Sequence, residues 1–478
     1  MNNKGSDSKL DNSAIRRYDN QFWVHPWEAL DSIGSQNRTI AGSGEGIYLY
    51  NENGDKLIDG PGGMWCTQIG YGRMDMAQAI AEQVIRMPYN SPWSFTSEPA
   101  ARLAEKLAHL APADLNHVFF TTGGSTAVDT ALRFAQFYNN VLGRPNKKKI
   151  ISRENAYHGS TYLSASCSGK GRDKTFMDTD TRSVHFLPPV NYYHCGTGMT
   201  EVEFCQAKVD DLLNKILELG PDNVAAFIAE PVLASGGVVV PPSGYHKKCL
   251  DICRKYDVLY TSDEVVTGFG RLGHWFASAD VFDIEPDIIT TAKGLTSGYL
   301  PLGACIISDR VFSQVSGENA KGVVFSNGYT YSGHPVSCAA ALKNIEIFER
   351  EGILEHVRDV APYFQHKIRE LSDIPLVGEV RGAGLIGCVE CVGEEPRESL
   401  ELHKTIGARI DAHCQKMGLI LRPLINMCVF SPPLIITRAQ VDDMVGILER
   451  GIRLTMEDLE REGLWTRPDA PVERKASY

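Results

Sequence analysis

The sequence predicts an α/β protein, with a large domain built on a mostly parallel central sheet and a smaller α+β domain formed by both chain ends. Between residues 117 and 308, short apolar segments alternate with segments of helical periodicity. The apolar segments show no polar alternation, which is typical of strands buried on both faces of a parallel sheet. Toward either end of the chain the pattern changes to a hairpin, shorter strands and long helices.

The segment before the alternating region predicts a hairpin and two helices. Alternating apolar residues flank Asn53-Gly54 within residues 44–60, and this pair tolerates the positive φ of a tight turn. Apolar residues recur at helical spacing over 77–87 and again over 99–110. Residues 1–20 are polar and lack the apolar core of a signal sequence, so we expect them to be retained and partly flexible.

The alternating region and the C-terminal part supply the other expected elements. Strands are predicted at 117–121, 149–152, 223–232, 258–262, 287–291 and 302–308, with helices over 126–139, 201–219 and 243–256. Later elements are a helix over 334–350, strands around 376–390 and 418–434, and a final helix over 438–462. We therefore divide the chain into a large domain, 71–333, and a small domain made of 1–70 and 334–478.

Composition excludes several classes of protein. Among 478 residues, 48 Lys and Arg stand against 59 Asp and Glu, and this net charge of −11 argues against a nucleic-acid-binding protein. The sequence contains no run of about 18 uncharged apolar residues, so we expect no membrane-spanning helix. The twelve cysteines have no repeated spacing, so we expect reduced thiols, no metal site and a cytoplasmic protein.

Two polar motifs follow the first strands of the predicted sheet, at the edge where ligands of such sheets bind. Residues 121–127, TTGGSTA, join a strand to a helix, and the helix N-terminus offers free N–H groups to an anion. Taken alone, an ordinary capped turn explains this loop equally well. Residues 157–160, YHGS, could place an aromatic ring over a flat ligand, although a surface loop is an equal alternative.

Two further motifs follow later strands. Asp263 and Glu264 close an apolar strand, and buried carboxylates need a partner, although a helix cap or a loop would also account for them. Lys293, between Ala292 and Gly294, ends another strand. A lysine without water around it has a lowered pKa and attacks carbonyl carbons, whereas a surface lysine is the plain alternative for an isolated residue.

Together the four motifs supply an anion site, an aromatic ring, a buried acid and an amine nucleophile. Pyridoxal phosphate needs these four groups, for its phosphate, its ring, its pyridine nitrogen and its aldehyde. No zinc-protease motif, no serine-hydrolase elbow and no nucleotide-binding loop competes with this interpretation.

The sequence resembles the class III (subgroup II) pyridoxal-phosphate-dependent aminotransferases over residues 22–460, and it is most similar to the branch that uses ω-amino acids or amines with pyruvate. The decisive matches are SDEVVTGFGRLG (262–273) and DIITTAKG (287–294). Further matches in the same order are HPW (25–27), GGMWC (62–66), TTGGSTAVDTALR (121–133), AYHGST (156–161), AEPVLASGGVVVPPSGY (229–245), GYTYSGHP (328–335) and ILRP (420–423). The resemblance implies the transferase fold type I of this cofactor class.

The resemblance also implies roles for individual residues. Lys293 would bind the cofactor as a Schiff base and then act as base and acid, and Asp263 would pair with the pyridine nitrogen. Arg422 would bind the carboxylate of the acceptor, although an exposed strand arginine is an alternative. The remaining cofactor-binding residues would be Gly124, Ser125, Thr126, Tyr157, His158, Glu230, Val265 and, across a dimer interface, Thr330, while Trp27, Trp65 and Tyr157 would line the substrate pocket.

The implied function is transfer of an amino group from an ω-amino acid or primary amine to pyruvate or a similar 2-oxo acid, in a ping-pong cycle of a homodimer or a tetramer. An aminomutase or decarboxylase of the same fold, or a non-catalytic cofactor-binding protein, remains an alternative. Thr126 departs from the acidic residue of many relatives, and its hydroxyl could add a phosphate contact. Trp93 either narrows the site or belongs to the core.

Overall fold

The computed structural model describes residues 11–35, 38–392 and 399–466. Its largest sheet has seven strands in the order β4-β10-β9-β8-β7-β5-β6. The strands are β4 (Leu115–Thr121), β5 (Lys149–Arg153), β6 (Val184–Leu187), β7 (Val224–Ala229), β8 (Leu259–Asp263), β9 (Ile288–Thr291) and β10 (Gly303–Ser308). The short strand β6 was not expected from the sequence.

Strand β10 is the exception to an otherwise parallel sheet. The neighbours from β6 to β9 all pair in parallel, whereas β10 pairs antiparallel with both β9 and β4. The connection from β9 to β10 contains only one turn of 3-10 helix, Lys293–Leu295, and a parallel crossover needs a longer segment. The prediction of a mostly parallel sheet is thus confirmed, with one strand reversed because its connection is short.

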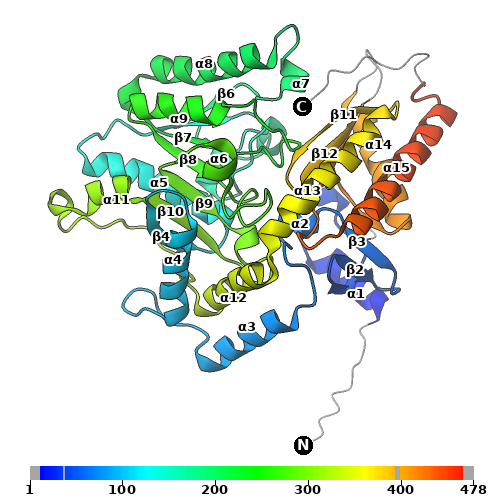
Figure 1. The fold of residues 1–478 in the computed structure, drawn as a ribbon, viewed down its shortest axis with the longest axis horizontal. Helices are drawn as coiled ribbons and strands as arrows, with labels where there is room; N and C mark the ends of the chain where they lie inside the picture. Colours follow the sequence, from blue (N-terminus) through cyan, green and yellow to red (C-terminus); the bar gives the residue numbers. More distant parts are fainter. Residues whose placement is uncertain (1–10, 36–37, 393–398, 467–478) are drawn as a thin grey trace, which may run out of the picture.

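Helices cover the sheet and the segments around it (Figure 1). Helix α5 (Gly124–Val141) packs on the central strands, and α8 (Glu201–Leu219) and α9 (Tyr245–Lys255) pack against each other beside β7 and β8. The other helices of this part are α3 (Met74–Arg86), α4 (Glu98–Leu110), α6 (Tyr162–Cys167), α7 (Tyr192–Cys195), α10 (Ala277–Phe282), α11 (Asp309–Ser316) and α12 (Pro335–Glu351).

The two chain ends share a second sheet. Strands β1 (Ala41–Glu45), β2 (Tyr48–Asn51) and β3 (Lys56–Asp59) form the predicted hairpin with one extra strand, and β13 (Leu419–Ile420) pairs in parallel with β3. Segments that lie far apart in the sequence therefore lie side by side. The domain boundaries at residues 70 and 333 stay a prediction.

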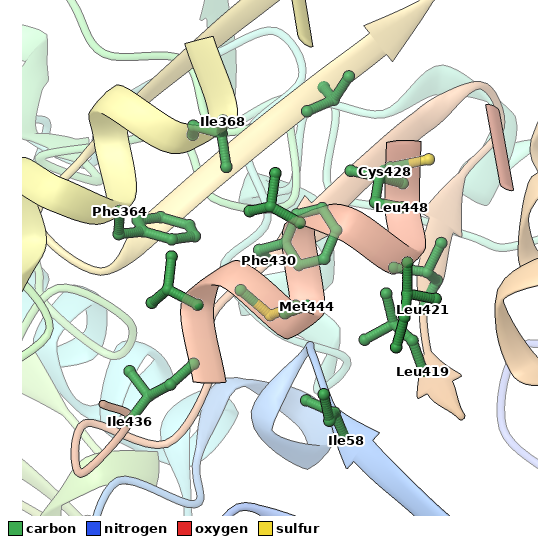
Figure 2. Packing of buried hydrophobic residues seen from close by; sticks show 14 of the residues in the cluster. Ile58, Phe364, Ile368, Leu419, Leu421, Cys428, Phe430, Ile436, Met444 and Leu448 are labelled. Atoms are coloured by element: carbon green, nitrogen blue, oxygen red, sulfur yellow. The ribbon is translucent and has the colours of Figure 1, made fainter. Parts of the chain in front are cut away.

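A third sheet carries the C-terminal part. It consists of β11 (Val377–Ala383), β12 (Ile386–Cys391), β15 (Met427–Phe430) and β14 (Arg422–Leu424), all antiparallel. Helices α13 (Ile353–Arg369), α14 (Leu400–Lys416) and α15 (Arg438–Arg461) supply its core, in which Phe364, Phe430 and Met444 pack together with Ile58 of β3 (Figure 2). Helices α13 and α14 were not expected.

The described part of the N-terminal segment contains a helix that the sequence analysis did not predict. Residues 12–22 form helix α1 (Asn12–Phe22), whose first turn is capped by the side chain of Asp11. Arg16 holds this helix on the hairpin by bonding the Arg38 carbonyl at 2.9 Å and by an ion pair with Glu52. Residues 1–10 lie outside the described residues. None of the described helices has the length and apolar character needed to cross a membrane.

The fold brings the four sequence motifs to one edge of the large sheet. Because β4, β5, β8 and β9 all run in the same direction, their carboxyl ends meet there. The short helix α2 (Gly62–Trp65) and strand β14 reach the same edge from the smaller sheets.

Candidate active site

A cavity of about 560 Å³ lies at the carboxyl ends of the parallel strands. It draws on segments from the whole chain, from residue 27 to residue 424. Of the residues singled out in the sequence, eleven line it: Trp27, Trp65, Gly124, Ser125, Tyr157, His158, Glu230, Asp263, Val265, Lys293 and Arg422. Thr126 and Thr330 do not line it.

Asp263 is the last residue of β8, and its carboxylate is held from two sides. Its Oδ2 lies 2.6 Å from Nδ1 of His158, and its Oδ1 accepts bonds of 3.2 Å from the Thr290 hydroxyl and from the backbone N–H of Val265. Asp263 is 4% exposed. A buried carboxylate that is held in this way can accept a strong bond from a cationic N–H group of a ligand.

Glu264 follows the end of β8 and does not line the cavity. Its carboxylate accepts bonds from the backbone N–H of Ala277 at 2.7 Å and of Ser278 at 2.8 Å, and from the Thr267 hydroxyl at 3.0 Å. The two acids that close β8 therefore have different tasks: Asp263 faces the cavity, and Glu264 fixes the segment that follows.

His158 and Glu230 continue the network behind Asp263. Nε2 of His158 is buried without a hydrogen-bond partner, although its Nδ1 bonds Asp263. Glu230 accepts bonds from the backbone N–H of Tyr157 at 3.0 Å and of Ala234 at 3.1 Å. Burial raises the pKa of Glu230, and the nearby charge of Asp263 adds to this effect.

Lys293 follows β9 and lies in a strained backbone conformation. Its φ is 36°, in the left-handed region that non-glycine residues avoid, and such strain is concentrated at functional sites. Burial lowers the pKa of its ammonium group, while the charge of Asp263 opposes that shift. Its Nζ lies 5.4 Å from the centre of the Trp65 ring. A desolvated amine in a cavity is suited to attack a carbonyl carbon.

The start of α5 presents backbone N–H groups that an anion could bind. The first N–H groups of this 18-residue helix have no partner within it, and they carry the positive end of the helix dipole. A Cβ at Gly124 would lie 3.1 Å from Cγ1 of Val265, so glycine is what lets the helix start approach the cavity. Ser125 Oγ accepts a bond of 3.0 Å from the Ser160 N–H, which ties this turn to the loop after Tyr157.

Thr126 does not offer its hydroxyl to the cavity, contrary to expectation. Its Oγ1 donates to the Gly123 carbonyl at 2.9 Å and accepts from the Thr122 N–H at 3.2 Å. The side chain thus closes the strand-to-helix turn, because a threonine that follows a tight glycine turn finds backbone partners first. Only its backbone N–H, in the first turn of α5, remains for an anion.

Arg422 lies at the start of β14 between two aromatic rings. Its guanidinium carbon is 5.8 Å from the Trp27 ring centre and 6.0 Å from the Trp65 ring centre. Burial lowers the pKa of Arg422, and among the described residues no carboxylate forms an ion pair with it. Arg422 is half-buried in the cavity wall, so the alternative of an exposed strand arginine is wrong.

Tyr157 and Val265 both line the cavity, from the loops after β5 and β8. The Tyr157 hydroxyl lies 3.0 Å from Ser160 Oγ, and its ring meets Trp27 edge-on with centroids 6.3 Å apart. That the two side chains face opposite sides of a bound ring stays a prediction.

Two expected residues lie elsewhere on the surface. Thr330 is exposed, and its carbonyl accepts a bond of 3.0 Å from the Tyr89 hydroxyl. Trp93 is 92% exposed and does not line the cavity, so neither its place in the core nor its place in the wall of this chain's site is confirmed.

The sequence analysis missed four polar residues of the cavity wall: Lys170, Arg172, Asp173 and Ser235. The first three belong to a loop that follows no strand of the sheet, so the search at strand ends passed over them. Their signal is the concentration of charge and glycine in Gly169–Asp173.

Comparison with known proteins identifies the family. A sequence model of the class III aminotransferases matches residues 33–452. The chain belongs to the class III aminotransferases. A putrescine–pyruvate aminotransferase of Pseudomonas aeruginosa is 38% identical over 93% of this chain and 97% of that protein. The mitochondrial gamma-aminobutyrate transaminase 1 of Oryza sativa subsp. indica is 39% identical over 86% of this chain and 81% of that protein.

Solved structures agree with the family assignment. An ω-transaminase from Pseudomonas jessenii in complex with PMP superposes with a TM-score of 0.89 at 35% identity, over 93% of this chain and 99% of that one. This class III aminotransferase is therefore a pyridoxal-phosphate-dependent enzyme of fold type I.

The residues of the cavity fit this cofactor. The start of α5 with Gly124 and Ser125 suits its phosphate, and the acceptor Asp263 suits its protonated pyridine nitrogen. The desolvated amine of Lys293 suits its aldehyde. The unpartnered Nε2 of His158 is one more polar atom that a bound group or water can satisfy.

Proposed function

We propose that this class III aminotransferase moves an amino group from an ω-amino acid or primary amine to pyruvate or a similar 2-oxo acid. The observation that carries the proposal is the position of Lys293 and Arg422, which both lie beside the Trp65 ring in one cavity. A substrate that reacts at Lys293 can therefore place a carboxylate at Arg422.

Pyridoxal phosphate, when bound, supplies a carbonyl group for the amine and a ring that accepts electrons from the reacting carbon. Lys293 then has two successive tasks in the proposal. Its amine would hold the cofactor, and once free it would serve as the base and acid that moves a proton to and from the donor carbon. Burial lowers the pKa of Lys293, and this shift favours the unprotonated amine that a base requires.

Asp263 keeps the ring in its electron-accepting form by holding a proton at the pyridine nitrogen. His158 fixes the carboxylate in position through the bond of 2.6 Å, and Thr290 and the Val265 N–H fix its other oxygen. The Glu230 carboxylate accepts a bond from the Tyr157 N–H. It thereby orients the loop that carries the side chains of Tyr157 and His158.

Arg422 binds the carboxylate of the acceptor. Its guanidinium group offers two parallel N–H donors, the geometry that suits a carboxylate. Since no described carboxylate neutralises it, an anionic substrate can do so. Trp27 and Trp65 hold the guanidinium between their rings.

Assembly and location belong to the same proposal. We propose a homodimer in which Thr330 reaches the phosphate site of the partner. Exposed apolar side chains near Thr330 support it, since Tyr331 is 58% and Val324 73% exposed and Tyr89 packs edge-on against Tyr331. The free state of all twelve cysteines supports a reducing, cytoplasmic location.

The test is a pair of half-reactions followed by absorbance. The cofactor-loaded protein is mixed with a donor such as 4-aminobutyrate without acceptor, and pyruvate is added afterwards. The proposal expects loss of the cofactor band with the donor and its return with pyruvate. Release of carbon dioxide would favour the decarboxylase alternative instead, and no change with any donor would favour a non-catalytic protein.

A further inference from the structure

Lys170 is one of four Lys and Arg residues in the cavity wall, with Arg172, Lys293 and Arg422, and the proposed function gives it no task. It lines the cavity together with Arg422, and in the described part of the chain its ammonium group has neither an ion pair nor a hydrogen bond. Its neighbour Arg172 differs, because its Nε lies 3.2 Å from an oxygen of Asp173. Lys170 and Arg422 are thus two unpaired cations in one cavity.

The fold holds Lys170 in this position. The N–H of Gly169 donates to the Ala156 carbonyl at 2.8 Å, and the Gly169 carbonyl accepts from the Asn155 N–H at 3.3 Å. A Cβ at residue 169 would lie only 2.1 Å from the Arg153 carbonyl oxygen. The backbone beside Lys170 is therefore pressed against the segment that leads to Tyr157.

The charges around Lys170 leave it without a neutralising partner. Burial lowers the pKa of Lys170 to about 8, and the charges of Arg172 and Arg422 act in the same direction, while those of Asp173 and Glu230 oppose them. Asp173 is engaged by Arg172, and Glu230 accepts two backbone bonds. An anion brought by a ligand would relieve this repulsion, whereas a further cation would increase it.

We propose that Lys170 is a specificity-determining residue, which together with Arg422 selects amine donors that carry an anionic group at the end away from the amine. Carboxylates and sulfonates share this chemistry. A diamine would bring its second ammonium group toward two unpaired cations and would be a poor donor. This inference rests on the proposed function and narrows its donor class to ω-amino acids.

The preference follows the charge of Lys170. Below its pKa of about 8 the ammonium group attracts the anionic end of the donor, and above that value the attraction is lost. Arg172, Asp173, Glu230 and Arg422 are the charged groups that act on Lys170. The advantage of an anionic donor over a neutral one should therefore fall as pH rises through 8.

The test compares three donors of equal chain length on the cofactor-loaded full chain: 4-aminobutyrate, butylamine and 1,4-diaminobutane. The readout is kcat/KM of the first half-reaction. For the wild type we expect 4-aminobutyrate to be the best donor and the diamine the worst. In Lys170→Met the advantage of 4-aminobutyrate over butylamine should fall about tenfold, the size of one charge-assisted hydrogen bond, and Lys170→Arg should keep it.

Lys215→Met is the matched control, because Lys215 pairs with Glu218 on the surface of α8. It should leave all three values unchanged. An unchanged donor ratio in Lys170→Met would overturn the inference while the proposed function stands.

A binding measurement tests Lys170 without turnover. Calorimetry with pentanoate, which has the carboxylate but no amine, should show about tenfold weaker binding to Lys170→Met than to the wild type. If no donor reacts with the wild type, the proposed function fails, and the calorimetric comparison still decides whether Lys170 binds an anion. Equal affinities for pentanoate would overturn the inference.

Discussion

At the scale of the residue, the role of each charged side chain in the site is set by the groups that it contacts. Asp263 and Glu264 are adjacent in sequence, yet one is held by His158 at the cavity and the other by the start of α10. The amine of Lys293 and the guanidinium of Arg422 both lie beside the Trp65 ring, and burial lowers the pKa of each. The Trp65 ring is thus a common neighbour of the amine of Lys293 and the guanidinium of Arg422.

The pair Asp263 and Glu264 gives a matched comparison. Asp263→Asn should lower kcat about a hundredfold or more while the protein stays folded, because the amide cannot hold the proton at the ring nitrogen. Glu264→Gln should instead lower the melting temperature, because an amide nitrogen replaces one carboxylate oxygen and cannot accept the bond from one of the two backbone N–H groups at the start of α10. Half-reaction rates and thermal melts of both variants check the assignment. Loss of activity in Glu264→Gln at a temperature where it is folded would contradict it.

Arg422→Ala should weaken the use of pyruvate far more than the use of an uncharged aldehyde acceptor. The lost bidentate contact serves only an acceptor with a carboxylate. The measurement is kcat/KM for pyruvate and for butanal with one donor. Equal losses for the two acceptors would remove Arg422 from the proposed role.

Part of this site could be predicted from the sequence itself, because Gly124, Ser125, Tyr157, His158, Asp263 and Lys293 lie in motifs that follow predicted strands. The other five expected residues that line the cavity were implied by the family resemblance: Trp27, Trp65, Glu230, Val265 and Arg422. The positions of Lys170 and Ser235 in the cavity wall could not be predicted, because only the folded loops bring these residues to the cavity. The hydrogen-bond partner of the Thr126 hydroxyl could not be predicted either, because a threonine at a turn can bond either a ligand or the nearby backbone.

At the scale of the element, the start of helix α5 lies against the segment that follows strand β8, and Gly124 makes this close approach possible. A Cβ at Gly124 would press on Val265, whereas a Cβ at Gly123 would meet no atom within 4 Å, and its φ of 166° is extended backbone. The two neighbouring glycines thus differ in what they tolerate.

Gly124→Ala should lower the affinity for pyridoxal phosphate, because Val265 or the start of α5 must move. Gly123→Ala should bind the cofactor like the wild type. Equilibrium titration of the cofactor into both apo variants measures the difference. Equal dissociation constants would mean that the contact between Gly124 and Val265 does not shape the site.

There are physical reasons why some elements were not predicted from the sequence. Strand β6 has only four residues, too few for a clear pattern. Helix α14 has apolar residues on one face but also Gly407, which allows the close approach of the Ile425 carbonyl. The reversal of β10 depends on the length of a loop and not on the strand itself.

At the scale of the whole molecule, residues from both chain ends complete a cavity that the large sheet begins. Trp27 and Trp65 come from the N-terminal part and Arg422 from the C-terminal part, and β3 with β13 joins those parts in one sheet. The cofactor site and the substrate wall therefore come from different sheets.

The exposed apolar side chains around Thr330 predict a dimer that is needed for activity. Val324→Asp should shift the protein toward monomer and lower its cofactor affinity, because a charge there opposes burial at an interface. Analytical ultracentrifugation with and without cofactor measures the effect. A fully active monomer would contradict the contribution of Thr330 to a partner's site.

The most direct test of the central claim is the visible absorbance of the cofactor-loaded protein during a cycle of donor and acceptor. The account predicts a cofactor band that disappears when an ω-amino acid is added and returns when pyruvate is added. The Lys293→Ala variant should be folded but should lack this band. A protein that cannot be loaded with the cofactor, or a Lys293→Ala variant with turnover near that of the wild type, would contradict the account.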